Sequence, residues 1–96
     1  MVASGAAVSG CNITDSNLNG YVRDWVGGNS NPGGCGNISE WDVSRVTSLH
    51  STFDGASNFN SDISSWNVEK VTNMDNTFYG ASSFNRDLAA WNVEKV

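Results

Sequence analysis

The residues with the clearest chemical potential in this chain are asparagine and aspartate pairs at a fixed spacing. Asn60 and Asp62 recur 25 residues later as Asn85 and Asp87. Aligned oxygens of this kind can bind Ca²⁺, but calcium takes about six to eight oxygen ligands and each copy offers too few. Asparagine and aspartate side chains also bond the backbone of tight turns. We therefore expect a structural role for these pairs, and we predict neither a metal nor a cofactor.

Catalytic chemistry finds little support in the sequence. His50 is the only histidine, and the position 25 residues further on is Asp75. The serines have no repeating histidine and acid beside them, and no glycine-rich phosphate loop follows an expected strand. We therefore expect a protein that is not an enzyme, with His50 on the surface.

Two cysteines, Cys11 and Cys35, flank the segment that precedes the tryptophan-containing part of the chain. A structural zinc site takes about four ligands, so an isolated pair favours a disulfide, which forms in oxidising compartments. Asn12 and Asn37 begin Asn-x-Ser/Thr triplets beside these cysteines, and such triplets are acceptors for N-glycosylation. Together these features predict an extracellular, cell-surface or oxidising organelle lumen location.

Charge and hydropathy argue against two classes of partner. The net charge is −5 with only five lysines and arginines, which disfavours binding to nucleic acid phosphates. No stretch approaches the run of about 18 apolar residues needed for a membrane span. Residues 1–10 also lack the basic start and long apolar run of a secretory signal, and we expect them to form a flexible tail.

The elements that position these residues follow a period of 25 residues. Trp41, Trp66 and Trp91 fall in one register, and the residues between them match in order. The matched apolar pairs are Val43 and Val68, Val46 and Val71, Leu49 and Met74, Phe53 and Phe78, Phe59 and Phe84, and Ile63 and Leu88. A fixed period of this length is typical of proteins whose units bury their apolar faces against neighbouring units.

Each unit predicts a strand followed by a helix. Residues 39–44 alternate in polarity, with Trp41 on the apolar side. From Val46 the apolar spacing changes to three and four and ends near Gly55, which is typical of a helix with a glycine C-cap. We therefore expect an α/β solenoid, a leucine-rich-repeat-like stack of strand-helix units, over residues 37–96, with the third unit truncated.

Residues 11–36 are expected to form an N-terminal cap for this stack. Helix-start residues at 14–17 and glycines at 27–28 bound a helix whose apolar positions are Leu18, Tyr21, Val22, Trp25 and Val26. A glycine-rich loop with the only proline follows the helix, and the cysteine pair would staple the two together. At the opposite end, we expect the stack to continue in further units or to be covered by a partner, because an open solenoid end exposes core.

The outward side of the expected strands is the candidate binding face. Its residues form three rows: Glu40, Ser65 and Ala90; Asp42, Asn67 and Asn92; Ser44, Glu69 and Glu94. Solenoids present such rows as broad binding surfaces, although a merely solvated face is equally compatible with these residues. The tryptophans alternate in phase with the valines, so we expect them in the core and not in an aromatic binding platform.

The motif W-[DN]-V-x-x-V-T-x-[LM]-x-x-x-F-x-G-A-x-x-F-N-x-D-[IL], present in residues 41–63 and 66–88, resembles the BspA-type surface repeat of the DUF285 family. The resemblance covers residues 37–96. It implies a secreted or surface-exposed array used for adhesion or protein contacts, with no known enzymatic activity. We therefore expect a non-enzymatic module that binds a protein, or alternatively a glycan. The other expectation is an accessory structural subunit docked in a larger assembly.

Overall fold

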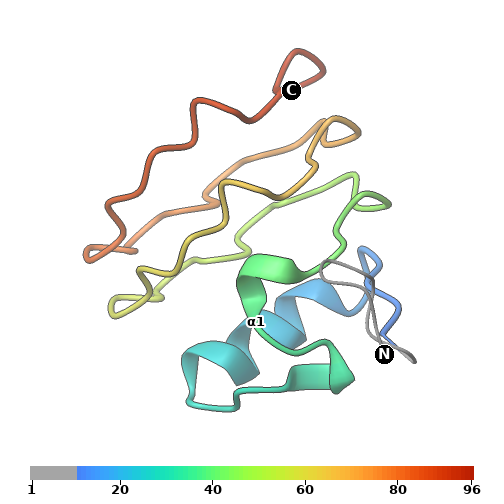
Figure 1. Cartoon of the computed structure of the whole chain (residues 1–96). Helices are drawn as coiled ribbons and strands as arrows, with labels where there is room; N and C mark the ends of the chain where they lie inside the picture. Colours follow the sequence, from blue (N-terminus) through green and yellow to red (C-terminus); the bar gives the residue numbers. More distant parts are fainter. Residues whose placement is uncertain (1–10) are drawn as a thin grey trace.

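A computed structural model describes residues 11–96, and its one α-helix in that range is α1, Leu18–Val26 (Figure 1). Leu18 and Val22 lie one turn apart on the same face of α1, and both are buried. The helix ends at Gly27, whose N–H donates to the Arg23 carbonyl. The predicted cap helix is therefore confirmed. The predicted flexible tail, residues 1–10, lies outside the described residues.

Two short 3₁₀ turns follow α1: η1, Pro32–Gly34, and η2, Ile38–Glu40. Gly33 of η1 has a φ of 59°, and a Cβ at this position would overlap the Tyr21 ring, so only glycine fits here. Cys11 and Cys35 form a disulfide with their Cα atoms 5.0 Å apart, as predicted. The bond joins the segment before α1 to the segment after it.

From Trp41 onward the chain winds in layers that rise one above another from α1 (Figure 1). We define the first layer as residues 41–65 and the second layer as residues 66–90. Backbone N–H groups of the first layer donate to carbonyls of the second: Leu49 to Asn73, Ser51 to Asp75, Phe53 to Thr77 and Gly55 to Tyr79, at 2.7 to 3.0 Å. The layers are thus joined by a parallel ladder of alternate N–H groups.

The prediction of a stack of strand-helix units is wrong. Residues 39–44 contain the end of η2 and a turn where a strand was expected, and residues 46–55 form a succession of turns where a helix was expected. Within residues 11–96, β-pairing is limited to one isolated parallel bridge between Ser48 and Asn73. The described layers therefore consist of turns and irregular backbone.

Two features of the backbone explain why the expected helix does not form. Alternate N–H groups from Leu49 to Gly55 donate to the second layer, so they cannot make the bonds to residue i−4 that define an α-helix. Ser51 and its counterpart Asn76 both have a φ of 56°, outside the right-handed helical region. The apolar spacing of three and four is satisfied here by successive turns.

The expected strand is replaced because side chains bond the local backbone. Asn37 Oδ1 accepts a hydrogen bond from the Ser39 N–H at 2.9 Å, and Asp42 Oδ1 accepts one from the Ser44 N–H at 3.0 Å. Such Asx turns bend the chain at both ends of residues 39–44. The alternation of polar and apolar residues there reflects turn geometry and not an extended strand.

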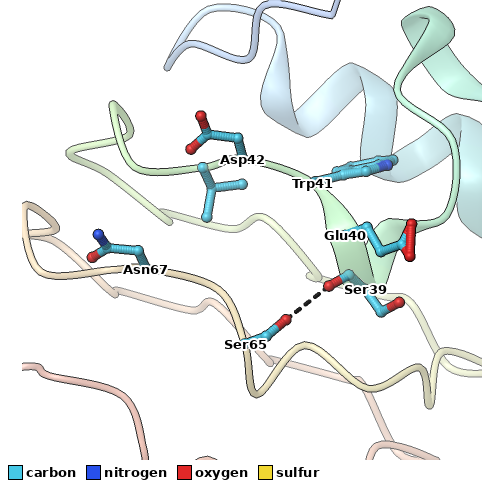
Figure 2. Close-up of a pocket in the computed structure, with 7 residues that line it drawn as sticks. Ser39, Glu40, Trp41, Asp42, Ser65 and Asn67 are labelled. Carbon is cyan, nitrogen blue, oxygen red and sulfur yellow. Dashed lines mark hydrogen bonds between the residues drawn. The ribbon is translucent and has the colours of Figure 1, made fainter. Parts of the chain in front are cut away.

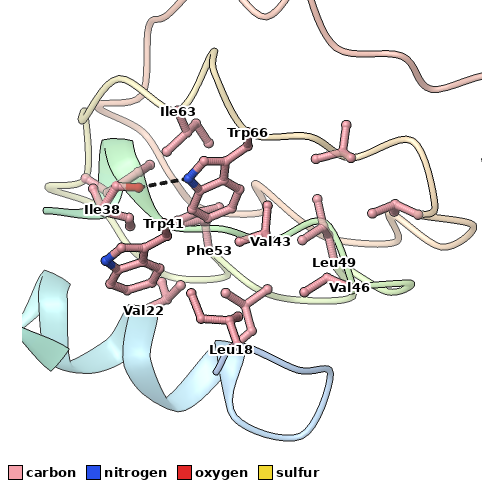
Figure 3. Packing of buried hydrophobic residues seen from close by; sticks show 14 of the residues in the cluster. Leu18, Val22, Ile38, Trp41, Val43, Val46, Leu49, Phe53, Ile63 and Trp66 are labelled. Carbon is pink, nitrogen blue, oxygen red and sulfur yellow. Dashed lines mark hydrogen bonds between the residues drawn. The ribbon is translucent and has the colours of Figure 1, made fainter. Parts of the chain in front are cut away.

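Aromatic rings stack from layer to layer, and Figure 3 shows Trp41 and Trp66 in neighbouring layers. Trp41 stacks on Trp66 with ring centroids 6.3 Å apart, and Trp66 stacks on Trp91 at 6.5 Å. Phe53 stacks on Phe78 at 5.4 Å. The three tryptophans are at most 9% exposed, which confirms that they belong to the core.

The buried indoles also bond the backbone. Their N–H groups donate to carbonyls as follows: Trp41 to Gly36 at 2.9 Å, Trp66 to Ile38 at 2.8 Å and Trp91 to Ile63 at 2.9 Å. Buried tryptophan needs such a partner for its polar atom. Each indole therefore contributes both apolar contact and a polar link between segments.

Candidate binding surface

The cap, residues 11–36, covers the first layer and makes hydrogen bonds like those that a preceding layer would make. In the second layer, the Thr72 N–H donates to the Thr47 carbonyl at 2.8 Å. In the first layer, the Thr47 N–H and hydroxyl donate to the two carboxylate oxygens of Asp15, at 2.8 and 2.6 Å. The Thr47 hydroxyl is the main cause of the lowered pKa of Asp15. A carboxylate therefore takes the place of a backbone carbonyl at this point.

Asn19 of α1 also replaces a contact that a preceding layer would make, in this case at His50 of the first layer. The Asp75 carbonyl of the second layer accepts from the Ser51 N–H at 3.0 Å. The corresponding carbonyl of the first layer, His50, accepts from the Asn19 side-chain amide at 3.1 Å. His50 itself is an exposed residue, as the sequence predicted.

A hollow of about 380 Å³ opens beside η2, where the first layer meets the second (Figure 2). Its lining consists of Ser39, Glu40, Trp41, Asp42, Val43, Ser65 and Asn67. The end of the first layer meets η2 here through a hydrogen bond of 2.8 Å from the Ser65 hydroxyl to the Ser39 carbonyl. The hollow thus brings together carboxylates and an amide, and the apolar members of its lining, Trp41 and Val43, are buried.

The hollow collects part of the binding face expected from the sequence. Of that set, Glu40, Asp42, Ser65 and Asn67 line it, whereas Ser44, Glu69, Asn92 and Glu94 do not. Asp42, Asn67 and Asn92 each use Oδ1 to accept the N–H two residues further on, at 3.0, 3.1 and 3.2 Å. This row therefore stabilises turns as well as facing solvent.

The electrostatics of the hollow favour hydrogen-bond donors. Glu40 and Asp42 are exposed residues that carry acceptor carboxylates. The Ser44 hydroxyl donates to Asp42 Oδ1 at 2.6 Å and is the main cause of the lowered pKa of Asp42. Asp42 is consequently ionised at neutral pH. Exposed carboxylates are suited to guanidinium, ammonium or hydroxyl groups.

The asparagine–aspartate pairs hold turns, as the structural interpretation predicted. Asn60 Oδ1 accepts from the Asn85 N–H of the second layer at 2.9 Å. Asp62 and Asp87 accept from the N–H groups two residues further on, at 2.9 and 2.8 Å. Across residues 11–96, no group of three or more histidine, cysteine, aspartate or glutamate side chains could hold a metal ion.

The asparagines of both glycosylation triplets, Asn12 and Asn37, are exposed. Asn37 Oδ1 accepts from the Ser39 hydroxyl at 2.8 Å, within the triplet itself. Asn12 Oδ1 accepts from the Arg45 guanidinium at 2.8 Å. Glycosylation of either residue stays a prediction.

Sequence reasoning misses the residues that join the cap to the first layer. It gives Asp15 only a place at a helix start, and it gives Asn19 no role. One signal points to Asp15, because it is an acidic residue directly before the cap helix. No signal in the sequence points to Thr52, a buried residue of the first layer whose hydroxyl makes no hydrogen bond.

The fold and the hollow define a stack of turn layers with a disulfide-linked helical cap and an acidic recess on its side. The chain belongs to the family described as "Mycoplasma protein of unknown function, DUF285", whose model matches residues 29–96. No curated protein and no solved structure matches the chain. None of the helices described between residues 11 and 96 is long and apolar enough to cross a membrane.

Proposed function

We propose that this chain is a non-enzymatic binding module of a secreted or surface-exposed protein, and that the hollow is its contact surface for a partner protein with basic side chains. The presence of two exposed carboxylates, Glu40 and Asp42, and of the Asn67 amide in the lining of one hollow carries the proposal (Figure 2). An arginine or lysine places its charged head near carboxylates and its apolar stem along the rest of the lining. The hollow offers both kinds of contact.

The proposed location draws on different features. The disulfide between Cys11 and Cys35 forms most readily in an oxidising compartment. Asn12 and Asn37 are exposed, as acceptors of a glycan must be. The resemblance to BspA-type surface repeats also favours a protein that is exported and makes contacts with other proteins.

Isothermal titration calorimetry with an acetylated, amidated Gly-Arg-Gly-Arg-Gly peptide tests the proposed partner chemistry. Glu40→Gln and Glu94→Gln each remove one negative charge, but only Glu40 lines the hollow. We expect Glu40→Gln to weaken binding about fivefold, because a charge-assisted hydrogen bond is lost. Glu94→Gln should leave the affinity unchanged.

Equal weakening by both variants would show that only net charge matters and would contradict a specific site. The absence of peptide binding to the wild-type chain would contradict it as well. If a neutral oligosaccharide binds and loses its affinity on replacement of Asp42 and Asn67, the partner is a glycan and the basic-protein proposal is wrong.

A second candidate function, a structural subunit docked in a larger assembly, is favoured by apolar residues exposed in and beyond the second layer. Tyr79 is 70% exposed, Val93 45% and Val96 55%, whereas Val43 and Val68 are 1% exposed. Exposed apolar side chains of this size are available for contact with another subunit. A hydrophobic dye should bind these side chains and lose signal in a Tyr79→Ser, Val93→Ser variant. An unchanged dye signal would contradict this candidate.

A further inference from the structure

We infer that a second recess, the groove between α1 and the first layer, binds through its backbone a peptide segment that adopts the turn conformation of residues 49–55. The groove has a volume of about 470 Å³, within the range of roughly 300–1,000 Å³ typical of ligand sites. Val22, Arg23 and Val26 line it from α1, and Thr52, Asp54 and Gly55 line it from the first layer. It shares no lining residue with the hollow and does not depend on the function proposed for that site.

The first observation is a buried hydroxyl without a partner. Thr52 is 4% exposed, and its Oγ1 makes no hydrogen bond. The equivalent hydroxyl of the second layer, Thr77, donates to the Leu49 carbonyl of the first layer at 2.8 Å and to the Met74 carbonyl at 2.8 Å. Thr52 lacks both bonds: α1, in the place of a preceding layer, offers it no carbonyl, and the Leu49 carbonyl, the local equivalent of Met74, accepts from the Thr77 hydroxyl and the Thr52 N–H. Buried hydroxyls are normally paired, so Thr52 is a donor that a ligand acceptor would satisfy.

The second observation concerns the backbone next to Thr52. In the second layer, the Thr77 and Tyr79 carbonyls accept from the N–H groups of Phe53 and Gly55, at 2.9 and 2.7 Å. The corresponding carbonyls of the first layer belong to Thr52 and Asp54. Within residues 11–96 these two carbonyls accept no hydrogen bond, and the same backbone geometry directs them toward the groove.

The cap explains why the free groups occur at this place. Asp15 and Asn19 satisfy the backbone of the first layer at Thr47 and His50. Beyond His50, no side chain of the cap bonds the backbone of the first layer, and the groove begins at Ser51 and Thr52. Two carbonyls of this short stretch are therefore left without partners within residues 11–96.

Together, the Thr52 hydroxyl and the Thr52 and Asp54 carbonyls favour a ligand that binds through its own backbone N–H and carbonyl groups. A peptide in the turn conformation of residues 49–55 presents N–H groups at alternate residues to the Thr52 and Asp54 carbonyls, and also supplies a carbonyl for the Thr52 hydroxyl. Residues 49–55 make these same contacts to the second layer. Val22 and Val26 provide an apolar wall beside the ligand. The peptide would run parallel to the first layer.

Titration of the ¹⁵N-labelled chain, followed by NMR, tests this inference. The probe is an acetylated, amidated Leu-His-Ser-Thr-Phe-Asp-Gly peptide, the sequence of residues 49–55. We expect saturating shifts at the amides of Val26, Gly27 and Gly55, with none at Asn67. The same peptide N-methylated at its Phe and Gly keeps its side chains but lacks the two donors, and it should bind at least about tenfold more weakly. Equal binding of both peptides would overturn the proposal, as would shifts at Asn67 alone.

A protein variant gives an independent test. Thr52→Val keeps the shape of the side chain and removes only the unpartnered hydroxyl, so the fold should persist. Peptide binding should weaken about fivefold. Thr72→Val makes the same substitution on an exposed residue outside the groove, where it removes a bond of 3.3 Å from the Thr72 hydroxyl to the Thr47 carbonyl, and it should leave the affinity unchanged. If Thr52→Val binds the peptide as tightly as the wild-type chain does, the hydroxyl has no role and the proposal fails.

Discussion

At the scale of single residues, polar side chains decide how one layer joins the next. Thr52 and Thr77 occupy equivalent positions and are both buried, at 4% and 3% exposure. Thr77 bridges the two layers through its hydroxyl, whereas Thr52 has no partner. The same residue type therefore stabilises the fold at one position and is free for binding at the other.

This contrast predicts opposite effects of the same substitution. Thr77→Val should lower the free energy of unfolding by about 1–3 kcal/mol, because it leaves the Leu49 carbonyl without its hydroxyl donor. Thr52→Val should change it by less than about 0.5 kcal/mol or raise it, since no bond is lost and a desolvation cost disappears. Urea denaturation followed by tryptophan fluorescence measures both. A larger loss for Thr52→Val than for Thr77→Val would contradict the hydrogen-bond assignment.

The carboxylate that joins the cap to the first layer predicts a pH dependence. Bonds from Thr47 and Ser48 hold the pKa of Asp15 below its ordinary value of 3.8. The folded pKa is thus lower than the unfolded one, so the stabilisation is complete above the unfolded pKa and is lost as the pH falls through the folded pKa. Stability should decline below about pH 4.

Asp15→Asn is the matched variant for this prediction. It should flatten part of the decline in unfolding free energy that urea titrations measure at acidic pH. Asp42 and Asp62 also have lowered pKa values because of hydrogen bonds from Ser44 and Ser64, so a residual slope should remain. An identical acid profile for Asp15→Asn and the wild-type chain would contradict the role given to Asp15.

At the scale of elements, α1 acts as a substitute for a layer. It buries Leu18 and Val22 and places Tyr21 and Trp25 edge-on against Trp41, each with ring centroids 6.4 Å apart. The disulfide closes the cap around these contacts. The cap is therefore held by packing, by side-chain hydrogen bonds and by one covalent link.

Reduction of the disulfide should weaken the cap before the layers. The bond between Cys11 and Cys35 spans 24 residues, and its loss should lower the free energy of unfolding by roughly 3 kcal/mol. Hydrogen exchange read by NMR should accelerate more at the Val22 amide than at the Phe53 amide. Equal acceleration at both amides would show that cap and layers unfold as one unit.

The sequence predicted α1 and the disulfide well because their signals are local: an apolar face at helical spacing, a terminal glycine and a single cysteine pair. The layers were harder, because an alternating pattern such as Trp41 to Val43 arises from turns as well as from strands. Asp42 bonds its own turn through the Ser44 N–H, which apolar periodicity does not reveal. Apolar spacing alone therefore identified the core residues but not the backbone conformation.

The hollow and the groove were also only partly predictable from the sequence. Residue types on the outward rows indicated a polar surface, but the hollow arises where Ser65, at the end of the first layer, meets Ser39 of η2. That contact depends on how the first layer returns past η2, which the residue types of either segment do not specify. The groove is harder still to predict, because the free hydroxyl of Thr52 results from the contacts that α1 does not make.

At the scale of the whole molecule, one continuous core runs from Ile13 to Trp91, and both recesses border it, the hollow at Trp41 and Val43 and the groove at Val22. Leu49 and Phe53 of the first layer are fully buried, whereas their counterparts Met74 and Phe78 are only partly buried. The first layer is thus more deeply buried than the second layer. A deeply buried layer holds the side chains of the hollow in place, as a preorganised contact surface requires.

The most direct test of the proposed binding function is NMR titration of the ¹⁵N-labelled chain with the acetylated, amidated Gly-Arg-Gly-Arg-Gly peptide. We predict saturating shifts at the amides of Asp42, Val43 and Asn67, and the loss of these shifts in a Glu40→Gln, Asp42→Asn variant. This variant keeps the turn, because the side-chain amide oxygen introduced by Asp42→Asn still accepts the Ser44 N–H. Shifts spread over the whole acidic surface, or shifts at the hollow that persist in the variant, would contradict a specific contact site there.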